Sequence, residues 1–328
     1  MTHLTTFTVM KNEGPYLLEW VAYQKVFGAR DILVMSNHCV DATVPMLMRL
    51  EEMGVVRHVP NPSQVSLFHG RGGERHHIAG RRYAELFPEW RRADYILMCD
   101  TDEFPVTFSG DGDVAALIEA AGAADVISLA EIVFGAGTFD LDRPVMERMD
   151  RCSSLTPGKW RARKGVKSFC RRLDGLDIRN HRPVADPDIA DRLNWVDGSG
   201  AQVPAEFRTE HIQGVDCRGR YELGGLYHAP LKSAEEYILK AARGDAVMVE
   251  RDRFTLKYWR SRNRQESSDT RIAPLRAKAL KLRADWLTDP VLARHHRASI
   301  ATHTSMLAAL LEQPNWAALH DEITQAAG

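Results

Sequence analysis

Two carboxylates two residues apart are the chain's clearest candidates for chemistry. Asp100 and Asp102 stand in the run Asp-Thr-Asp-Glu-Phe, directly after the apolar stretch 95–99. In an extended backbone, side chains two residues apart project to the same face, so both carboxylates can converge on one cation. Hard divalent ions such as Mn²⁺ and Mg²⁺ prefer oxygen ligands and leave coordination positions for substrate phosphates. The pair therefore predicts a Mn²⁺ or Mg²⁺ site that neutralises charge on a diphosphate leaving group.

The segments before this pair alternate between strand-like and helix-like patterns. Strands are expected at 4–10, 31–36 and 55–59, and helices over 16–25 and 44–53. Such alternation favours a parallel sheet covered by helices. Open α/β sheets bind ligands beyond the carboxyl ends of their strands, which is where the apolar stretch 95–99 places the acidic pair.

Length and composition indicate an ordinary globular protein. The 328 residues suit one large α/β domain with an appendage, and 44% hydrophobic with 27% charged residues is typical of a folded chain. Lys and Arg number 43 against 44 Asp and Glu, a net charge of −1. Because this balance offers no global field for a polyanion, nucleic acid is not expected as a partner.

Cysteine usage and hydropathy bear on location. The five cysteines show no C-x-x-C spacing, which favours a reducing cytoplasm over a disulfide framework or a zinc knuckle. The chain opens without a basic region followed by an apolar run, and no stretch approaches the roughly 20 apolar residues that cross a bilayer. We therefore expect a cytoplasmic protein whose membrane association, if any, is peripheral and at the inner face. Homo-oligomerisation stays open.

Several further motifs give the chain a family resemblance. Over roughly the first 245 positions it resembles the family 2 and family 92 type glycosyltransferases of the GT-A fold. The matching segments are Lys11-Asn12-Glu13, the loop Asn37 to Thr43, Asp100 to Phe104, Lys164 to Ser168, and Tyr227 to Gly244. The resemblance implies an α/β fold with a Rossmann-like mixed sheet flanked by helices. It also implies a transferase domain over 1–245, with a nucleotide-binding half of about 1–105 and an acceptor half of about 106–245, and a helical C-terminal extension over 246–328.

The resemblance and the charges together assign binding roles. In that family the opening loop receives the nucleotide base, and the resemblance implies that Asp41 contacts the nucleoside or caps the next helix. Cations near a leaving phosphate become more valuable as charge accumulates there, although each could equally be a surface cation. The expected nucleotide- and diphosphate-binding residues are Asn12, Glu13, Asp41, Asp100, Lys167 and Lys232.

Metal and proton-transfer roles complete the expected site. The resemblance makes His228 a third metal ligand beside Asp100 and Asp102, and a satisfied half-buried ring is the alternative. An inverting transfer also needs a carboxylate or histidine that removes the proton of the acceptor hydroxyl. Glu131 and Glu210 are the candidates for this base, while the inverting or retaining outcome stays open.

The sequence thus favours a metal-dependent glycosyltransferase. We expect it to move a hexose from a nucleotide-sugar, with a UDP-sugar as the first choice, to a carbohydrate or glycolipid acceptor in cell-surface polysaccharide synthesis. A sugar nucleotidyltransferase also uses paired carboxylates on an α/β sheet, but it would usually carry a Gly-rich phosphate loop after the first strand. A non-catalytic carbohydrate-binding protein on a degenerate transferase fold is the third hypothesis.

Overall fold

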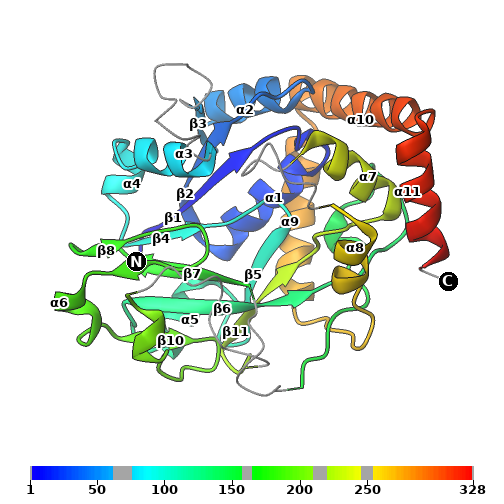
Figure 1. The fold of residues 1–328 in the computed structure, drawn as a ribbon. Helices are drawn as coiled ribbons and strands as arrows, with labels where there is room; N and C mark the ends of the chain where they lie inside the picture. Colours follow the sequence, from blue (N-terminus) through cyan, green and yellow to red (C-terminus); the bar gives the residue numbers. More distant parts are fainter. Residues whose placement is uncertain (1, 62–75, 157–164, 210–219, 245–253, 327–328) are drawn as a thin grey trace.

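A nine-stranded sheet organises the chain. The computed structural model describes residues 2–61, 76–156, 165–209, 220–244 and 254–326 (Figure 1). The strand order is β3-β2-β1-β4-β7-β6-β11-β5, and β10 pairs with β6 beside this path. The first four strands are parallel: β1 (Leu4–Met10), β2 (Ala29–Ser36), β3 (Arg57–Pro60) and β4 (Tyr95–Met98). The helices between them are α1 (Gly14–Phe27), α2 (Thr43–Glu52), α3 (His76–Ala84) and α4 (Pro88–Arg91).

The second half of the sheet contains strands of both directions. Strand β7 (Val166–Arg171) lies antiparallel between β4 and β6 (Val126–Val133). Strand β11 (Gly224–His228) is parallel to β6 and antiparallel to β5 (Glu103–Thr107), and β10 (Trp195–Asp197) is parallel to β6. The sheet is therefore mixed, as the family resemblance implied, and not wholly parallel as the alternation of elements alone suggested.

Short elements cover the remaining described chain in this half. They are α5 (Val114–Ala120), η3 (Val145–Glu147), the pair β8 (Leu176–Asp177) and β9 (Val184–Ala185), α6 (Pro187–Ala190) and η4 (Ala205–Phe207). All of them except α5 lie within 143–213, where the sequence shows poor periodicity and a high content of Pro, Gly and Arg, whereas α5 lies where the sequence indicates a helix.

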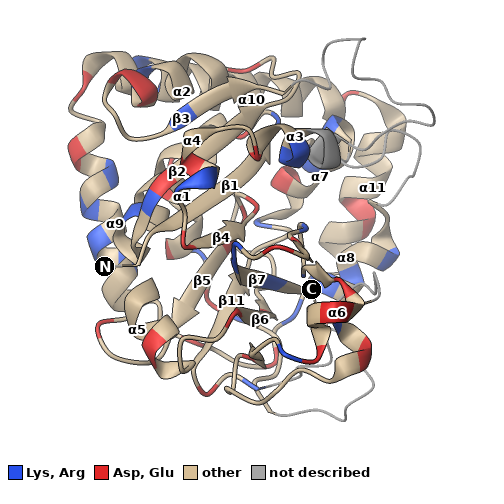
Figure 2. Ribbon diagram, turned by 90° about the vertical axis from the view of Figure 1, so that its left-hand side faces the viewer, with Lys and Arg blue, Asp and Glu red and all other residues tan. Residues whose placement is uncertain are grey.

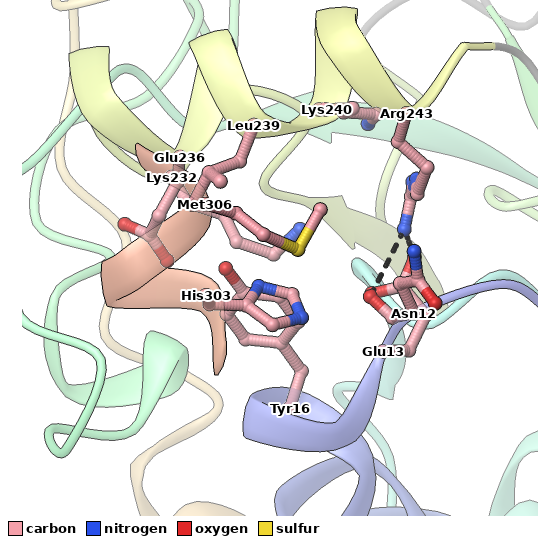
Figure 3. A pocket seen from close by; sticks show the side chains of 10 residues that line it. All are labelled: Asn12, Glu13, Tyr16, Lys232, Glu236, Leu239, Lys240, Arg243, His303 and Met306. Atoms are coloured by element: carbon pink, nitrogen blue, oxygen red, sulfur yellow. Dashed lines mark hydrogen bonds and ion pairs between the residues drawn. The ribbon is translucent and has the colours of Figure 1, made fainter. Parts of the chain in front are cut away.

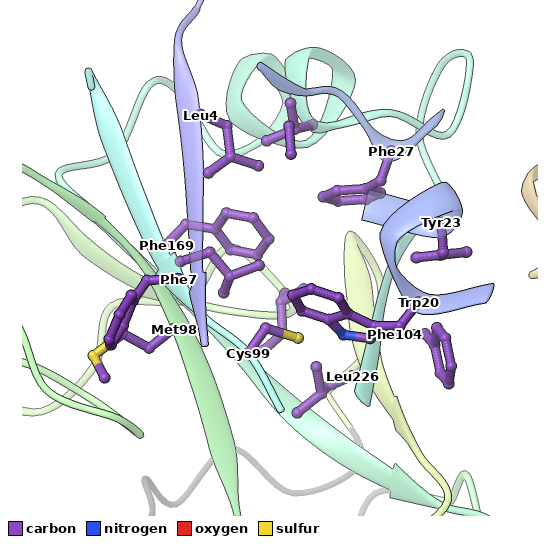
Figure 4. Close-up of a cluster of buried hydrophobic side chains, with 14 of the residues drawn as sticks. Leu4, Phe7, Trp20, Tyr23, Phe27, Met98, Cys99, Phe104, Phe169 and Leu226 are labelled. Atoms are coloured by element: carbon purple, nitrogen blue, oxygen red, sulfur yellow. The ribbon is translucent and has the colours of Figure 1, made fainter. Parts of the chain in front are cut away.

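An aromatic cluster fixes the position of the acidic segment against α1 (Figure 4). The rings of Tyr23 and Phe104 meet edge to face at 5.2 Å, and those of Phe27 and Phe169 lie 5.9 Å apart. The Tyr23 hydroxyl also donates to the carbonyl of Pro105 at 2.6 Å. Because these rings are buried, the start of β5 is held rigidly beside the end of β4.

The described chain after β11 is helical and packs partly into the core of the sheet and partly into a second hydrophobic cluster, which contains Tyr237, Trp259, Leu307 and Ile323. Its helices are α7 (Ala234–Arg243), α8 (Leu256–Arg262), α9 (Ala273–Trp286), α10 (Pro290–Leu311) and α11 (Pro314–Gln325). Helix α10 runs along the top of the molecule beside α2 and α7 (Figure 1). Leu275 and Ala279 of α9 and Leu292 of α10 belong to the hydrophobic core that also contains the sheet. The mixed sheet, its flanking helices and the helical C-terminal region are the architecture expected from the sequence.

Charge is distributed over the molecule in both signs. Figure 2 shows acidic segments on α6 and basic segments along α9. This distribution agrees with the net charge of −1. No helix in the described part of the chain combines the length and the hydropathy needed to cross a bilayer.

Candidate functional site

The two aspartates lie in a tight turn between β4 and β5. Glu103, the first residue of β5, closes this turn, because its backbone N–H donates to the Asp100 carbonyl at 3.1 Å. Its carboxylate in turn accepts a hydrogen bond from the Asp100 N–H at 2.9 Å. The side chain of Asp100 is half exposed, whereas Asp102 is buried. The turn therefore presents one accessible and one enclosed carboxylate at the carboxyl end of β4.

Each aspartate faces a lysine from a different element. Lys167 of β7 lies with its Nζ 2.9 Å from Asp100 Oδ2 and 3.1 Å from Glu103 Oε2. Burial alone would lower the pKa of Lys167, but Asp100 and Glu103 outweigh it and raise that pKa above its ordinary value. Lys240 of α7 lies with its Nζ 2.6 Å from Asp102 Oδ2. Asp100 and Asp102, whose pKa values are lowered, are thus ionised beside fixed cations, whereas burial raises the pKa of Glu103 to about 7.

His228, at the end of β11, faces Asp102. The antiparallel register pairs His228 with Glu103, and the His228 Nε2 lies 3.8 Å from Asp102 Oδ2. Burial would raise the pKa of Asp102, but Lys240 and His228 hold it well below its ordinary value. Burial likewise would lower the pKa of His228, but Asp102 and Glu131 raise it to about 10. The imidazole therefore carries a positive charge at neutral pH.

Glu131 of β6 lies on the other side of this histidine. Its Oε2 is 3.0 Å from the His228 Nδ1, and its Oε1 accepts from Arg262 at 2.7 Å and from the Gly165 N–H at 3.1 Å. Burial would raise the pKa of Glu131, but His228 and Arg262 hold it far below its ordinary value. A carboxylate with both oxygens engaged and a depressed pKa is a weak base, and its geometry is that of a group that orients His228.

The donor types at this turn fit a hard divalent cation. The two carboxylates suit Mn²⁺ or Mg²⁺, the imidazole favours Mn²⁺ over Mg²⁺, and a carboxylate on the far nitrogen of a ligating histidine is the usual orienting partner. In the structure, the carboxylates of Asp100 and Asp102 form ion pairs with Lys167 and Lys240 instead. Among the described residues, no three His, Cys, Asp or Glu side chains lie in an arrangement that could hold a metal ion as it stands. Cation binding would require Lys240 to turn away and His228 to release its Nε2 proton.

A pocket adjoins the acidic turn, because Lys240, which contacts Asp102, also lines the pocket. Figure 3 shows the side chains that line it. It is a recess that is partly open to solvent. Its lining comes from three places far apart in the sequence: Asn12, Glu13 and Tyr16; Lys232, Glu236, Leu239, Lys240 and Arg243; and His303 and Met306. Because Lys240 contacts Asp102, a ligand in this pocket could extend its anionic part toward the carboxylate pair.

The opening loop and the end of α7 are joined by reciprocal bonds. Arg243 donates to the Glu13 carboxylate and to the Lys11 carbonyl, the latter at 2.7 Å, and Lys11 Nζ donates to the Arg243 carbonyl at 3.0 Å. Asn12 Oδ1 accepts from the Val40 N–H at 2.8 Å, which holds the neighbouring loop. These bonds fix one wall of the pocket.

Two pocket residues have a left-handed backbone. Asn12 has φ 51° and Lys232 has φ 61°, a conformation that costs a lysine more than an asparagine. The Lys232 ammonium lies 4.4 Å from the centre of the Tyr16 ring, a cation–π distance. Burial lowers the pKa of Lys232. Strained residues of this kind cluster at binding sites, where the surrounding structure holds them in place.

Asp41 lies beside the pocket and is fully engaged. Its carboxylate accepts from the Thr43 N–H at 3.0 Å, from Ser299 Oγ at 2.8 Å and from the His303 Nε2 at 3.0 Å. Its side chain has no exposed surface. Of the two expected roles, the contacts agree with the capping of α2, and they add a connection to α10 that the sequence did not indicate.

The structure brings most of the expected residues together. Asp100, Asp102, His228, Glu131 and Lys167 surround the acidic turn, and Asn12, Glu13 and Lys232 line the adjoining pocket. Glu210 lies outside the described residues.

The functional residues that the sequence reasoning missed come from other elements. Lys240 and Arg243 stand in the matched segment after Tyr227, so this segment was the available signal for them. Arg262, His303 and Met306 carry no motif, and only the fold brings them to the site.

Comparisons with known proteins give weak similarities. The crystal structure of S. aureus TarS 1–349 shares 11% sequence identity, with a TM-score of 0.32, over 95% of this chain and 92% of that chain. Its complex with UDP shares 10% identity, with a TM-score of 0.33, over 74% and 65%. A further S. aureus TarS structure shares 10%, with a TM-score of 0.32, over 93% and 55%. No protein-family model and no curated protein matches the sequence. At these levels neither the fold nor the activity of TarS transfers to this chain.

Proposed function

We propose that the protein is a metal-dependent glycosyltransferase. It would move a sugar from a nucleotide-sugar, with a UDP-sugar as the expected donor, to a carbohydrate or glycolipid acceptor in cell-surface polysaccharide synthesis. The observation that carries this proposal is that the acidic turn lies next to a pocket lined by cationic side chains. A carboxylate pair with a histidine at the end of β4 shares Lys240 with a pocket that also contains Lys232 and Arg243.

The site residues have two proposed roles: some bind the nucleotide-sugar donor, and others bind the metal ion. In this proposal Asn12 and Glu13 lie beside the nucleoside, and Lys232 and Lys240 lie along the diphosphate. Asp100, Asp102 and His228 would hold Mn²⁺ or Mg²⁺, which supplies positive charge to the departing nucleoside diphosphate. Fixed cations beside a leaving group stabilise the transition state most where solvent is excluded.

Glu131 enters the proposal as a positioning residue for His228. Its two oxygens accept three hydrogen bonds and its pKa is depressed, so it holds a proton poorly. Glu210 remains the proposed base that takes the proton of the acceptor hydroxyl.

The decisive experiment measures sugar transfer and donor hydrolysis with a panel of nucleotide-sugars, with Mn²⁺ and with EDTA. We expect activity with at least one donor in Mn²⁺. Asp102→Asn should lower kcat by about 100-fold or more, because charge stabilisation by a metal contributes several kcal/mol. Asp111→Asn, which alters an exposed aspartate outside the site, is the matched control and should keep wild-type activity.

The rival functions give different results in the same assay. A sugar nucleotidyltransferase would form nucleotide-sugar from a nucleoside triphosphate and a sugar phosphate and would release pyrophosphate. A non-catalytic carbohydrate-binding protein would turn over no donor under either condition. Full activity in Asp102→Asn would refute the role of the carboxylate pair.

A further inference from the structure

Helix α10 forms one wall of the pocket, although it lies in the region without a recognisable motif. His303 and Met306 both line the pocket, opposite Asn12 and Glu13 of the opening loop (Figure 3). His303 is 262 positions from Asp41, the residue to which its ring is bonded. A helix that only completed the core would not need to place a histidine between this aspartate and the pocket.

Two buried polar atoms of the pocket residues have no hydrogen-bond partner within the described structure. They are Glu13 Oε2 and His303 Nδ1. Both side chains are more than nine-tenths buried, at 9% and 6% exposure. Buried polar atoms are almost always hydrogen-bonded, and both of these belong to residues that line one pocket, so a ligand there can complete their bonding.

The other polar atom of each side chain already has a hydrogen-bond partner, and this determines whether the remaining atom acts as a donor or an acceptor. Arg243 donates to the other oxygen of Glu13, and Asp41 Oδ2 lies 3.0 Å from the His303 Nε2. A carboxylate on Nε2 favours the tautomer with its proton there, which leaves Nδ1 as an acceptor. The pocket therefore offers two acceptors to a ligand that presents N–H or O–H groups.

The remaining surfaces define the rest of the ligand. Tyr16, Leu239 and Met306 provide apolar contact, and Lys232, Lys240 and Arg243 provide positive charge, of which Lys240 contacts Asp102. A flat group with two donors joined to an anionic part matches this combination. A nucleoside diphosphate has that chemistry, with donors on its base and its ribose.

We propose that α10 is part of the donor pocket, and that His303, together with Glu13, recognises the nucleoside part of the donor. The proposal rests on the proposed function and assigns the C-terminal helical region a direct role in substrate binding. Asp41 and Ser299 hold α10 in place, since Ser299 Oγ donates to the same Asp41 oxygen at 2.8 Å.

The test is calorimetric titration of the full-length protein with UDP, CDP, GDP and ADP, and with pyrophosphate, each with and without Mn²⁺. For the nucleoside diphosphate that binds wild type most tightly, His303→Ala should weaken affinity by about tenfold, the effect of losing one net hydrogen bond. Pyrophosphate affinity should stay within about twofold of wild type, since it has no nucleoside. Met306→Ala should weaken nucleoside diphosphate binding in the same way, and it leaves the bonds of Asp41 unchanged.

Two matched controls separate ligand contact from anchoring of the helix. Ser299→Ala removes a bond to Asp41 but does not line the pocket, and His295→Ala removes another histidine of α10 outside the pocket. Both should bind the nucleoside diphosphate within about twofold of wild type. If His303→Ala does not fold, as judged by circular dichroism, Met306→Ala alone carries the test.

The outcomes distinguish this inference from the proposed function. If wild type binds none of the nucleoside diphosphates, the proposed function fails and this inference falls with it. If wild type binds one and both pocket variants bind it equally well, the proposed function survives and the role of α10 is refuted. Equal weakening by Ser299→Ala and His303→Ala would also refute it, because His303 would then act only through Asp41.

Discussion

At the scale of single residues, substitution of Glu131 tests whether this carboxylate orients His228 for metal binding. Its carboxylate bonds the His228 Nδ1 at 3.0 Å and so aims the Nε2 at Asp102. Partners of this kind commonly raise metal affinity by about 10- to 100-fold. Glu131→Gln removes the charge that orients and polarises the ring, so we expect Mn²⁺ affinity to fall by that factor in calorimetric titration.

A second glutamate gives the matched control for this prediction. Glu119 lies on α5 with an exposed side chain, and Glu119→Gln should leave Mn²⁺ affinity unchanged. An unaltered Mn²⁺ affinity in Glu131→Gln would show that His228 is not a ligand or does not depend on Glu131 for its orientation.

The residue scale also shows which parts of the site the sequence could predict. Asp100 and Asp102 can be predicted as a pair because residues two positions apart in the sequence are necessarily close in space. The partners of these residues are not, since Lys240 is 138 positions from Asp102 and Arg262 is 131 from Glu131. Spacing along the chain predicts contacts within an element, but it does not predict which distant element returns to complete the site.

At the scale of elements, Glu19 connects α1 to the short helix η3. Its two carboxylate oxygens accept from the N–H groups of Val145 and Met146 at 2.7 and 2.6 Å. Burial raises the pKa of Glu19 from 4.5 to about 7, despite these bonds and despite nearby Arg283 and Arg148. The folded state therefore binds this proton more tightly than the unfolded state does.

The sign of the pH dependence follows from this raised pKa. The contribution of Glu19 to the free energy of unfolding is fully present below pH 4.5 and is lost as pH rises through about 7. Glu19→Gln leaves one backbone N–H without an acceptor, but that cost does not vary with pH. The unfolding free energy of wild type minus that of Glu19→Gln should thus fall by up to about 3 kcal/mol over this range. Urea unfolding at several pH values measures it, and a flat difference would contradict the prediction.

Strand β5 shows why some elements escaped the sequence analysis. Its segment Glu103–Thr107 contains Pro105, which cannot donate to a sheet and argues against a strand. The structure accommodates it because β5 is the last strand in the sheet order and bonds only β11 along that path. By contrast, β1 was predictable from its β-branched residues, and β4 from its buried and uninterrupted apolar run.

At the scale of the whole molecule, α9 and the first part of α10 are integral to the main hydrophobic core. The sequence predicted them as a helical extension, because an amphipathic pattern indicates a buried face without indicating what buries it. In the structure α9 packs along α1, and Leu275 lies within the main hydrophobic core at 4% exposure. The stability of the sheet should therefore depend on these helices.

Leu275→Ala tests this dependence directly. Removal of a buried leucine side chain costs about 2–5 kcal/mol of unfolding free energy, and Leu86→Ala, at a position 57% exposed, should cost far less. Because the core is shared, hydrogen exchange should show equal loss of protection in the most protected amides of β1 and of α10. A loss confined to α9, α10 and α11 would mean that the C-terminal helices unfold as an independent unit. In that case the pocket wall formed by α10 could open while the sheet stays folded, and donor affinity would fall with the stability of the helices alone.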